Sequence, residues 1–366
     1  MTSSELDRRY SHQELLTFSE TVFNKLGFSP EDAATAACCL TRADLRGIDS
    51  HGIARLSGYV RLHKAGRLNA KPELKFTSNY PGLARLDADK AIGFISATRA
   101  MERCITMAEE IGCGMVAVYN SNHFGIAGQY ALMAAEKGLA GMAFTNASPL
   151  VAPSHSLDRM LGTNPIAAAF PSLRSRPFVL DMATTTAANG KLEILQRKGL
   201  EAPEGWIQDA AGLNSTNPFE LKNGGALLPL GGNGQAGGHK GYGLGSMVDI
   251  FSGVLSGANF GPWVPPFVSF LPLPENPVGE GIGHFFMAFR PDGFMPMEDY
   301  LRRMETWMDS MRQASAIGEE PVQVPGDPEW KEEEIRSRDG IMLHPEVLRD
   351  LQQLAEEMSI STGLFL

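Results

Sequence analysis

Residues 115–145 read MVAVYNSNHFGIAGQYALMAAEKGLAGMAFT, and this stretch decides the fold class. It opens on MVAVY at 115–119, an apolar run typical of a buried strand. Residues 128–138 then follow a helical pattern, and residues 140–145 form a second apolar run. A strand, a helix and another strand in succession indicate an α/β core with a largely covered sheet.

The rest of the chain extends this pattern in both directions. Further strands are expected at 74–77, 83–86, 166–170, 178–182 and 283–290, and further helices at 92–111, 240–256, 297–315 and 345–358. Residues 11–45 predict two helices, a third is expected from near Ser50 to about Ala65, and VPGDPEW near the C-terminus is expected to be a loop. We divide the chain into an N-terminal helical segment (1–70), an α/β domain (71–295), and a C-terminal helical segment that packs back on the N-terminal part (296–366).

The composition of the 366 residues argues against several functional classes. Hydrophobic residues make up 43% and charged residues 20%, and the formal net charge is −10. An acidic balance without clustered Lys and Arg argues against nucleic-acid binding. The polar N-terminus lacks a signal-peptide core, and the apolar region 254–274 is broken by prolines and glycines, so no membrane span is expected.

The cysteines and histidines point to a cytoplasmic protein without a metal site. Cys38, Cys39, Cys104 and Cys113 show no C-x-x-C spacing, and we expect reduced core thiols. The eight histidines include no H-E-x-x-H motif.

The stretch Asp49-Ser50-His51-Gly52-Ile53-Ala54-Arg55 combines a possible proton carrier with a possible anion site. If a helix capped by the Asp-Ser pair starts near Ser50, His51 and Arg55 lie one turn apart on one face. The Arg fork suits a carboxylate, and His exchanges protons near neutral pH. The alternative is a surface helix with a charged face.

Four further stretches follow strands or open helices, where loops commonly carry function. Asn120–Gly128 brings His123 to the end of a strand, although Asn and Ser are also typical of turns. Thr145–Pro149 and Gly162–Pro165 offer hydroxyls and amides for a ligand or a turn. Leu180–Thr186 places Asp181 at a strand end, where it could bind a nicotinamide amide, a ribose or phosphates, while its threonines could cap a helix.

Gly231–Gly243 is a glycine-rich stretch that contains Lys240 at the start of a helix, a setting that favours anions. It formally matches G-x-G-x-x-G, but the preceding run LLPL contains proline and Asp249 follows too closely for a Rossmann fingerprint. A phosphate-cradling loop and a flexible linker are both compatible with it.

Taken together, these motifs resemble the malate/L-lactate dehydrogenase family that lacks a Rossmann fold. The resemblance rests on ADLRGIDSHGIARL, NSNHFGIAG, GTNPIAAAFP, FVLDMATT and GGHKGYGLG, in that order. It implies a helical segment with an α/β domain and a mixed sheet, and usually a homodimer with the active site near the subunit interface. It further implies an NAD- or NADP-dependent oxidoreductase that interconverts a small 2-hydroxy acid and its 2-oxo acid.

The resemblance also implies roles for individual residues. His51 and His123 match the acid/base histidines, and Ser50 is kept beside them as a catalytic candidate. Arg55 and Thr163 match positions that hold the substrate carboxylate. The positions that match cofactor contacts are Ser148, Asp181, Met182, Ala183, Lys240, Gly326, Asp327 and Pro328. Residues 184–230 align only loosely, which leaves the acid open.

The expected chemistry is hydride transfer coupled to a proton. Arg55 should fix the carboxylate and lower the pKa of His51, His51 should protonate the carbonyl oxygen, and His123 should assist or take that role. Relatives leave open a cyclic imino acid or diketogulonate reductase, or a ureidoglycolate dehydrogenase. Outside the family, Lys240 could bind pyridoxal phosphate, whereas a hydrolase using Ser50 is disfavoured because adjacent Ser50 and His51 side chains should be badly placed to pair.

Overall fold

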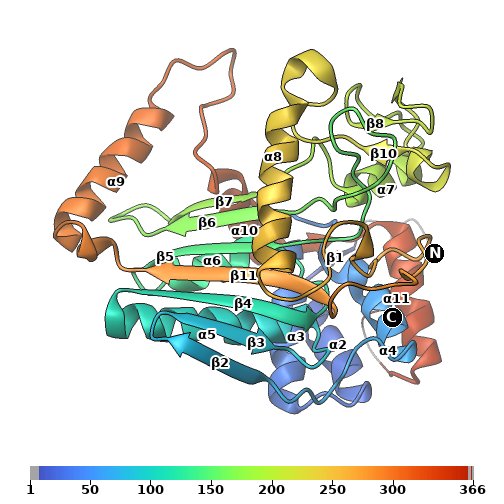
Figure 1. The fold of residues 1–366 in the computed structure, drawn as a ribbon, viewed down its shortest axis with the longest axis horizontal. Helices are drawn as coiled ribbons and strands as arrows, with labels where there is room; N and C mark the ends of the chain where they lie inside the picture. Colours follow the sequence, from blue (N-terminus) through green and yellow to red (C-terminus); the bar gives the residue numbers. More distant parts are fainter. Residues whose placement is uncertain (1–7, 362–363, 365–366) are drawn as a thin grey trace.

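A mixed seven-stranded sheet forms the centre of the computed structural model, which describes residues 8–361 and 364 (Figure 1). The strand order is β2-β3-β4-β11-β5-β6-β7, and β3 and β4 are parallel whereas the other neighbours are antiparallel. The strands are β2 (Lys75–Tyr80), β3 (Leu83–Asp87), β4 (Cys113–Ser121), β5 (Ala140–Thr145), β6 (Ile166–Phe170), β7 (Phe178–Met182) and β11 (Ile282–Phe289). The prediction of an α/β fold with a mixed sheet is confirmed.

One face of this sheet is covered by the helices α5 (Gly93–Ile111) and α6 (Gly128–Ala135). Every second residue of the central strands points to these helices, as Val116, Val118 and Phe286 show, and all three are fully buried. Burying each such side chain stabilises the folded state by about 1.5–3 kcal/mol. Apolar runs in the sequence therefore predict strands that pack against helices.

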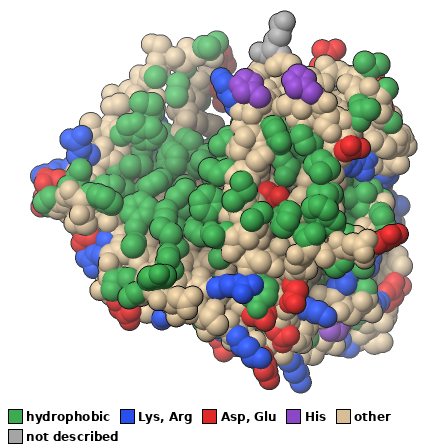
Figure 2. All heavy atoms as spheres, viewed as in Figure 1, with side chains coloured by type: hydrophobic (Ala, Val, Ile, Leu, Met, Phe, Trp, Pro, Cys, Tyr) green, Lys and Arg blue, Asp and Glu red, His purple; other side chains and the backbone are tan. Residues whose placement is uncertain are grey.

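The opposite face is covered only in part. Helix α8 (Gly238–Asp249) and the π-helical turn η4 (Ile250–Val254) cross the central strands, where Phe144, Val248 and Phe285 form a small core. Apolar side chains beyond this crossing reach the surface and form a broad apolar patch (Figure 2). The expectation of a largely covered sheet is therefore wrong for this face of the single chain.

Helices from both ends of the chain form a second core beside the sheet. They are α2 (His12–Lys25), α3 (Pro30–Leu45), α4 (Leu56–Lys64) and α11 (Pro345–Glu357). Ser11 and Glu14 form a capping box at α2, and Ser29 with Pro30 opens α3 as predicted. The short strands β1 (Arg9–Tyr10) and β12 (Ile341–Met342) also pair. Residues 1–7 of the predicted N-terminal segment lie outside the described residues, and the boundaries at 70 and 295 stay predictions.

Three segments differ from their predicted structure. Helix α4 begins at Leu56 after the 3-10 turn η1 (Ile53–Arg55), and not near Ser50. VPGDPEW is not all loop, because Asp327 and Pro328 start helix α10 (Asp327–Asp339) with proline in its first turn. The loosely aligned region contains helix α7 (Asn189–Lys198) and a small sheet of β8 (Ile207–Gln208), β9 (Asn214–Ser215) and β10 (Ala226–Leu227).

Helix α9 (Met297–Arg312) projects from the body of the molecule (Figure 1). Of the four cysteines, all free thiols, Cys38 and Cys113 are exposed, so they are not core residues as expected. Within residues 8–361, no helix is both long and apolar enough to cross a membrane. No cluster of His, Cys, Asp or Glu side chains in the described part of the chain is placed to hold a metal ion.

Candidate active site

The loop Asp49–Arg55 is held by a buried carboxylate and not by its own Asp-Ser cap. The Ile53 N–H donates to Asp44 Oδ2 at 2.7 Å. A Cβ atom at Gly52 would lie 2.0 Å from Asp44 Oδ1, so this approach requires glycine. The shared helix face predicted for His51 and Arg55 is therefore absent, because the backbone turns here to reach Asp44.

His51 and His123 nevertheless lie together. Their rings stack with centroids 5.8 Å apart and planes inclined by 18°. His123 follows strand β4, and the N-terminus of α5 packs directly on its backbone. A Cβ at Gly93 would lie 2.3 Å from the Asn122 carbonyl oxygen. The tertiary structure thus joins the two histidines that the sequence singled out.

Burial makes both histidines hard to protonate. It lowers the pKa of His51 to about 4, with a further lowering by Arg55 and a raising effect of Glu193. Burial also holds the pKa of His123 well below its usual range, as do the nearby His51 and Arg55. The predicted effect of Arg55 is present, but burial is the larger cause.

Hydrogen bonds distinguish the two rings. Ser50 Oγ lies 2.9 Å from His51 Nδ1, so the expectation that these neighbours are badly placed to pair is wrong. Tyr59 Oη lies 2.6 Å from His123 Nδ1. Burial raises the pKa of Tyr59 well above its usual range, so its hydroxyl stays protonated and is able to donate a hydrogen bond. The Gly125 N–H also points at His123 Nδ1 (3.4 Å), so neutral His123 carries its proton on Nε2.

Arg55 lies in a cavity of about 350 Å³ between this loop, helix α7 and the start of α11. Its Nε donates to the Ser50 carbonyl at 2.6 Å, and its Nη2 pairs with Glu193 Oε2 at 2.7 Å. Gly190 allows α7 to approach, since a Cβ there would lie 2.7 Å from Ser50 Cβ and 2.9 Å from Arg55 Nη2. The sequence prediction missed Glu193 and Gly190, although the spacing of Leu192 and Leu195 and the Gly199 cap could have revealed α7.

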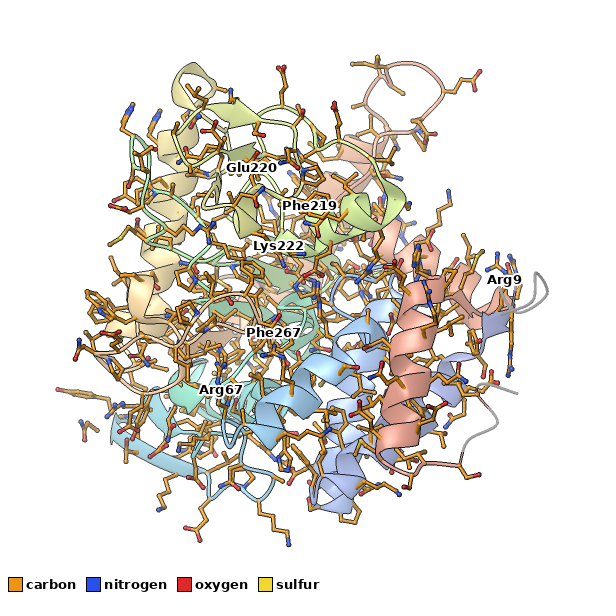
Figure 3. The ribbon with its side chains drawn as sticks, turned by 90° about the vertical axis from the view of Figure 1, so that its right-hand side faces the viewer. Arg9, Arg67, Phe219, Glu220, Lys222 and Phe267 are labelled. Atoms are coloured by element: carbon orange, nitrogen blue, oxygen red, sulfur yellow. The ribbon has the colours of Figure 1, made fainter. Side chains whose placement is uncertain are left out.

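Phe267, which is labelled in Figure 3, packs against the ring of His123. Its ring centroid is 4.6 Å from that of His123 and 5.1 Å from that of Tyr59. The Phe267 N–H donates to Ser148 Oγ at 2.9 Å. Ser148, predicted as a cofactor contact, thus supports the loop that carries Phe267. Tyr59 and Phe267 were also missed, because nothing in their local sequence marks them.

Thr163 is hydrogen-bonded to Thr184, which follows the end of strand β7. Its carbonyl oxygen accepts bonds from the Thr184 N–H (2.9 Å) and hydroxyl (3.1 Å). The threonines 184–186 bind carbonyl groups in this way and do not cap α7, whose N-cap is Ala188 without a side-chain bond. The helix-capping alternative for this run is therefore wrong.

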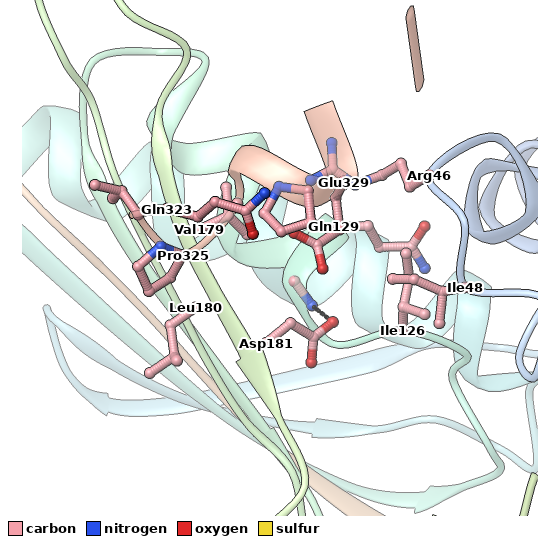
Figure 4. A pocket seen from close by; sticks show the side chains of 14 residues that line it. Arg46, Ile48, Ile126, Gln129, Val179, Leu180, Asp181, Gln323, Pro325 and Glu329 are labelled. Atoms are coloured by element: carbon pink, nitrogen blue, oxygen red, sulfur yellow. Dashed lines mark hydrogen bonds between the residues drawn. The ribbon is translucent and has the colours of Figure 1, made fainter. Parts of the chain in front are cut away.

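A second cavity, which we call the Asp181 pocket, lies at the end of β7 (Figure 4). It has a volume of about 290 Å³. Asp181 Oδ2 accepts a hydrogen bond from the Gly128 N–H at the start of α6 (2.7 Å). Desolvation of the carboxylate raises the pKa of Asp181 to about 6, although the residue as a whole is exposed.

Gly326 and Pro328 form the opposite wall of this pocket. A backbone bond from the Val179 N–H to the Pro325 carbonyl (3.1 Å) ties this wall to β7. The Asp327 carboxylate instead binds Arg312 through two hydrogen bonds, of 2.7 and 3.0 Å. The structure therefore joins Asp181 with Gly326 and Pro328, whereas the side chain of Asp327 has a supporting role.

The other predicted cofactor residues lie outside the residues that line this pocket. Met182 pairs with Ile166 in the sheet register, and Ala183 follows it. Lys240 is exposed on the first turn of α8, which crosses the opposite face of the sheet. The structure thus does not bring Met182, Ala183 and Lys240 into the Asp181 pocket.

Behind His123 lies a buried polar chain that the sequence prediction did not contain. His284 is fully buried, with Nδ1 2.7 Å from Thr145 Oγ1 and Nε2 2.9 Å from Ser121 Oγ. Its ring stacks on Phe124 at 4.8 Å, and burial lowers its pKa to about 3. This neutral histidine links β4, β5 and β11 beneath the residues that carry His123.

Comparison with known proteins decides the family. Residues 10–352 match the family model described as malate/L-lactate dehydrogenase. The chain belongs to the malate/L-lactate dehydrogenase family. A malate dehydrogenase of Pyrococcus abyssi is 42% identical over 354 residues, covering 96% of this chain and 95% of the relative. An L-sulfolactate dehydrogenase of Methanocaldococcus jannaschii is 33% identical, covering 93% and 94%.

The fold agrees with this assignment. The solved malate dehydrogenase of Pyrococcus horikoshii OT3 aligns with a TM-score of 0.87 and 37% identity, over 97% of each chain. As a member of the malate/L-lactate dehydrogenase family, the protein is an oxidoreductase of the CH–OH group of 2-hydroxy acids, and the family uses a nicotinamide cofactor. Membership also favours the dehydrogenase prediction over the pyridoxal phosphate and hydrolase alternatives.

Proposed function

We propose that this protein interconverts a 2-hydroxy acid of the malate/lactate type and its 2-oxo acid, with Arg55 holding the carboxylate and His51 carrying the proton. The observation that carries the proposal is the stacked pair His51 and His123 next to Arg55, where enclosure and the charge of Arg55 lower the pKa of both rings. A proton carrier and a carboxylate anchor side by side suit an acid whose carbonyl is next to its carboxylate.

Substrate binding should prepare His51 for proton donation. In the free protein the positive Arg55 and burial keep His51 neutral. A bound carboxylate neutralises Arg55 and so raises the pKa of His51. Ser50 Oγ can donate to or accept from His51 Nδ1, so His51 can gain and lose its proton without losing this partner. Ser50 is thereby a positioning residue for His51.

His123 has a more restricted part in this proposal. Because Tyr59 and the Gly125 N–H donate to its Nδ1, its Nε2–H is available as a hydrogen-bond donor to a carbonyl or alkoxide oxygen. This supports an assisting role for His123 with His51 as the principal acid. Thr163 is proposed as a second holder of the carboxylate.

The Asp181 pocket fits one nucleoside-sized part of a nicotinamide dinucleotide. Asp181 offers carboxylate oxygens to hydroxyl or amide N–H donors, beside the N-terminus of α6 and the backbone of Gly326. When bound, NAD or NADP supplies or accepts the hydride. Met182, Ala183, Ser148 and Lys240 are proposed as contacts of the remaining part, with Asp327 and Pro328 shaping the Gly326 wall.

A homodimer would explain the incompletely covered sheet face. Met115, Met142 and Met287 on that face are only partly buried, and Phe76 and Tyr80 at its edge are 41% and 68% exposed. Exposed apolar surfaces of this kind mark interfaces. We propose that a second copy covers this face, and that the protein acts in the cytoplasm. Light scattering of the purified protein would give twice the 39.6 kDa chain mass.

The decisive experiment is an absorbance assay of NADH and NADPH oxidation. The panel contains oxaloacetate, pyruvate, 2-oxoglutarate, diketogulonate and a cyclic imino acid, and ureidoglycolate with NAD tests the reverse direction. We expect reduction of oxaloacetate or pyruvate. His51→Ala should slow hydride transfer by roughly 10²–10⁴-fold, and His123→Ala by less. Near wild-type rates in both variants would disprove the catalytic scheme.

A further inference from the structure

Glu193 is the charged neighbour of Arg55 that the proposed function does not use. It lies in the second turn of α7, and its Oε2 is 2.7 Å from Arg55 Nη2. Its other oxygen, Oε1, accepts a hydrogen bond from Asn189 Nδ2 at 2.8 Å. The side chains of Arg55 and Glu193 are 19% and 25% exposed, so solvent screens this contact only weakly.

Protein oxygens already fill one side of the Arg55 guanidinium. Nε donates to the Ser50 carbonyl, and Nη2 donates to Glu193. A guanidinium can hold a carboxylate in two ways, through Nε with Nη2 or through Nη1 with Nη2. The first of these forks is occupied, so a substrate carboxylate must use the second and share Nη2 with Glu193.

Two carboxylates then flank a single positive charge. The other cation that lines the cavity and pairs with an acid, Arg197, binds Glu346 at 3.3 Å. Asp49, also at this cavity, pairs with Arg336. Lys198 also lines the cavity, but it is exposed, so solvent screens its charge. Glu193 is in direct contact with Arg55 and therefore exerts the stronger effect, a repulsion, on an anion held there. Such repulsion grows with each negative charge of the anion.

We propose that Glu193 is a specificity-determining residue that weakens acid binding at Arg55 and favours acids with one negative charge over acids with two. This inference rests on the proposed role of Arg55 in holding the substrate carboxylate. It predicts that, among acids of the malate/lactate type, monoanionic 2-oxo acids bind more tightly than dianionic ones.

A purely structural role would give a different result. If Glu193 only anchors α7 on the loop, its loss would loosen the helix and raise KM for every acid. Glu193→Gln keeps the shape and hydrogen-bonding groups of the side chain but removes its charge. Glu193→Asp keeps the charge and shortens the side chain.

The test compares KM and kcat for pyruvate, which has one charge, and oxaloacetate, which has two. In Glu193→Gln, we expect KM to fall about 3-fold for pyruvate and about 10-fold for oxaloacetate. Because Glu193 also raises the pKa of His51, kcat should fall, but by the same factor for both acids. Glu193→Asp should restore the wild-type ratio of the two KM values. Glu346→Gln, which removes an equal charge from the rim of the same cavity, should change that ratio by less than about 2-fold.

A second variant tests the opposite change. Asn189→Asp adds a negative charge beside Glu193 and should raise KM for oxaloacetate more than for pyruvate. The inference is overturned if the KM ratio is unchanged in both Glu193→Gln and Asn189→Asp, or if Glu346→Gln changes it as much as Glu193→Gln. A wild-type protein that reduces neither acid nor any other 2-oxo acid would instead overturn the proposed function, and this inference with it.

Discussion

The site formed by His51, His123 and Arg55, which we call the histidine site, differs from the Asp181 pocket in its electrostatics. At the histidine site, enclosure by the protein and the charge of Arg55 keep His51 and His123 neutral, and Arg55 is already paired with Glu193. In the Asp181 pocket, Asp181 as a whole is exposed, and its carboxylate is held by one backbone N–H. The difference fits the proposal that the first region controls a proton and the second holds a polar ligand.

Substitution of Arg55 should distinguish the functions of these two regions most clearly. Arg55→Ala deletes a charged hydrogen-bond donor and should raise KM for the 2-oxo acid roughly 100-fold, or about 3 kcal/mol, because a buried carboxylate loses its partner. KM for the nicotinamide cofactor should stay within about 2-fold. Steady-state kinetics measure both values. The control is Arg42→Ala, which removes the ion pair of Arg42, a residue of α3, with Glu136. A larger effect on the cofactor than on the acid would contradict the division.

Acid should destabilise the protein through its buried histidines. His51 and His284 have pKa values of about 4 and 3 in the folded protein, below the value near 6.5 in the unfolded chain. Unfolding therefore takes up protons below pH 6.5, and stability present at pH 7 is lost as the pH falls. His284 alone should lower the free energy of unfolding by about 2 kcal/mol at pH 5.

Asp181 opposes this trend, because its raised pKa favours the folded state as the pH falls below about 6. Its effect is smaller, since the residue as a whole is exposed. Urea unfolding at pH 7 and pH 5 measures the sum. His284→Gln should reduce the difference between the two pH values. Equal stability of the wild type at both would show that the histidines are not buried as described.

Asp181→Asn tests the pocket with a smaller change. The Asn oxygen can still accept from the Gly128 N–H, so the fold should be kept. Loss of the charge should raise KM for the cofactor roughly 10-fold, or about 1.4 kcal/mol, with little change for the acid. Cofactor titration by fluorescence measures the affinity directly. If KM rose for the acid and not for the cofactor, the proposed roles of the histidine site and the Asp181 pocket would have to be exchanged.

Gly190→Ala should give the smallest effect. The added Cβ would lie 2.7 Å from Ser50 Cβ and 2.9 Å from Arg55 Nη2, closer than real Cβ contacts, so α7 or the loop of Ser50 must shift. We expect KM for the acid to rise about 3-fold and the melting temperature to fall by about 2 °C. Gly293→Ala, where a Cβ meets nothing within 4 Å, is the matched control. Equal kinetics of the two variants would show that α7 does not press on Arg55.

Local sequence was sufficient for the elements whose signals are short-range. The strands within 115–145 alternate with a helix, and Ser11 and Ser29 with Pro30 mark helix starts, so these elements lie where they were expected. It was insufficient for the loop before Arg55, because the bond that shapes this loop comes from Asp44 in the preceding helix. Helix α10 was not predicted, because the stretch VPGDPEW, which contains its start, was interpreted as a loop.

The sequence by itself determined the α/β class, the family and the residue types of the site, because periodicity, caps and motifs are properties of neighbouring residues. Only the tertiary structure decided which of these residues meet. It stacked His51 on His123, placed Glu193 against Arg55, and joined Asp181 with Gly326. Such contacts depend on how helices and strands pack, and that packing is set by the whole core and not by the residues that it brings together.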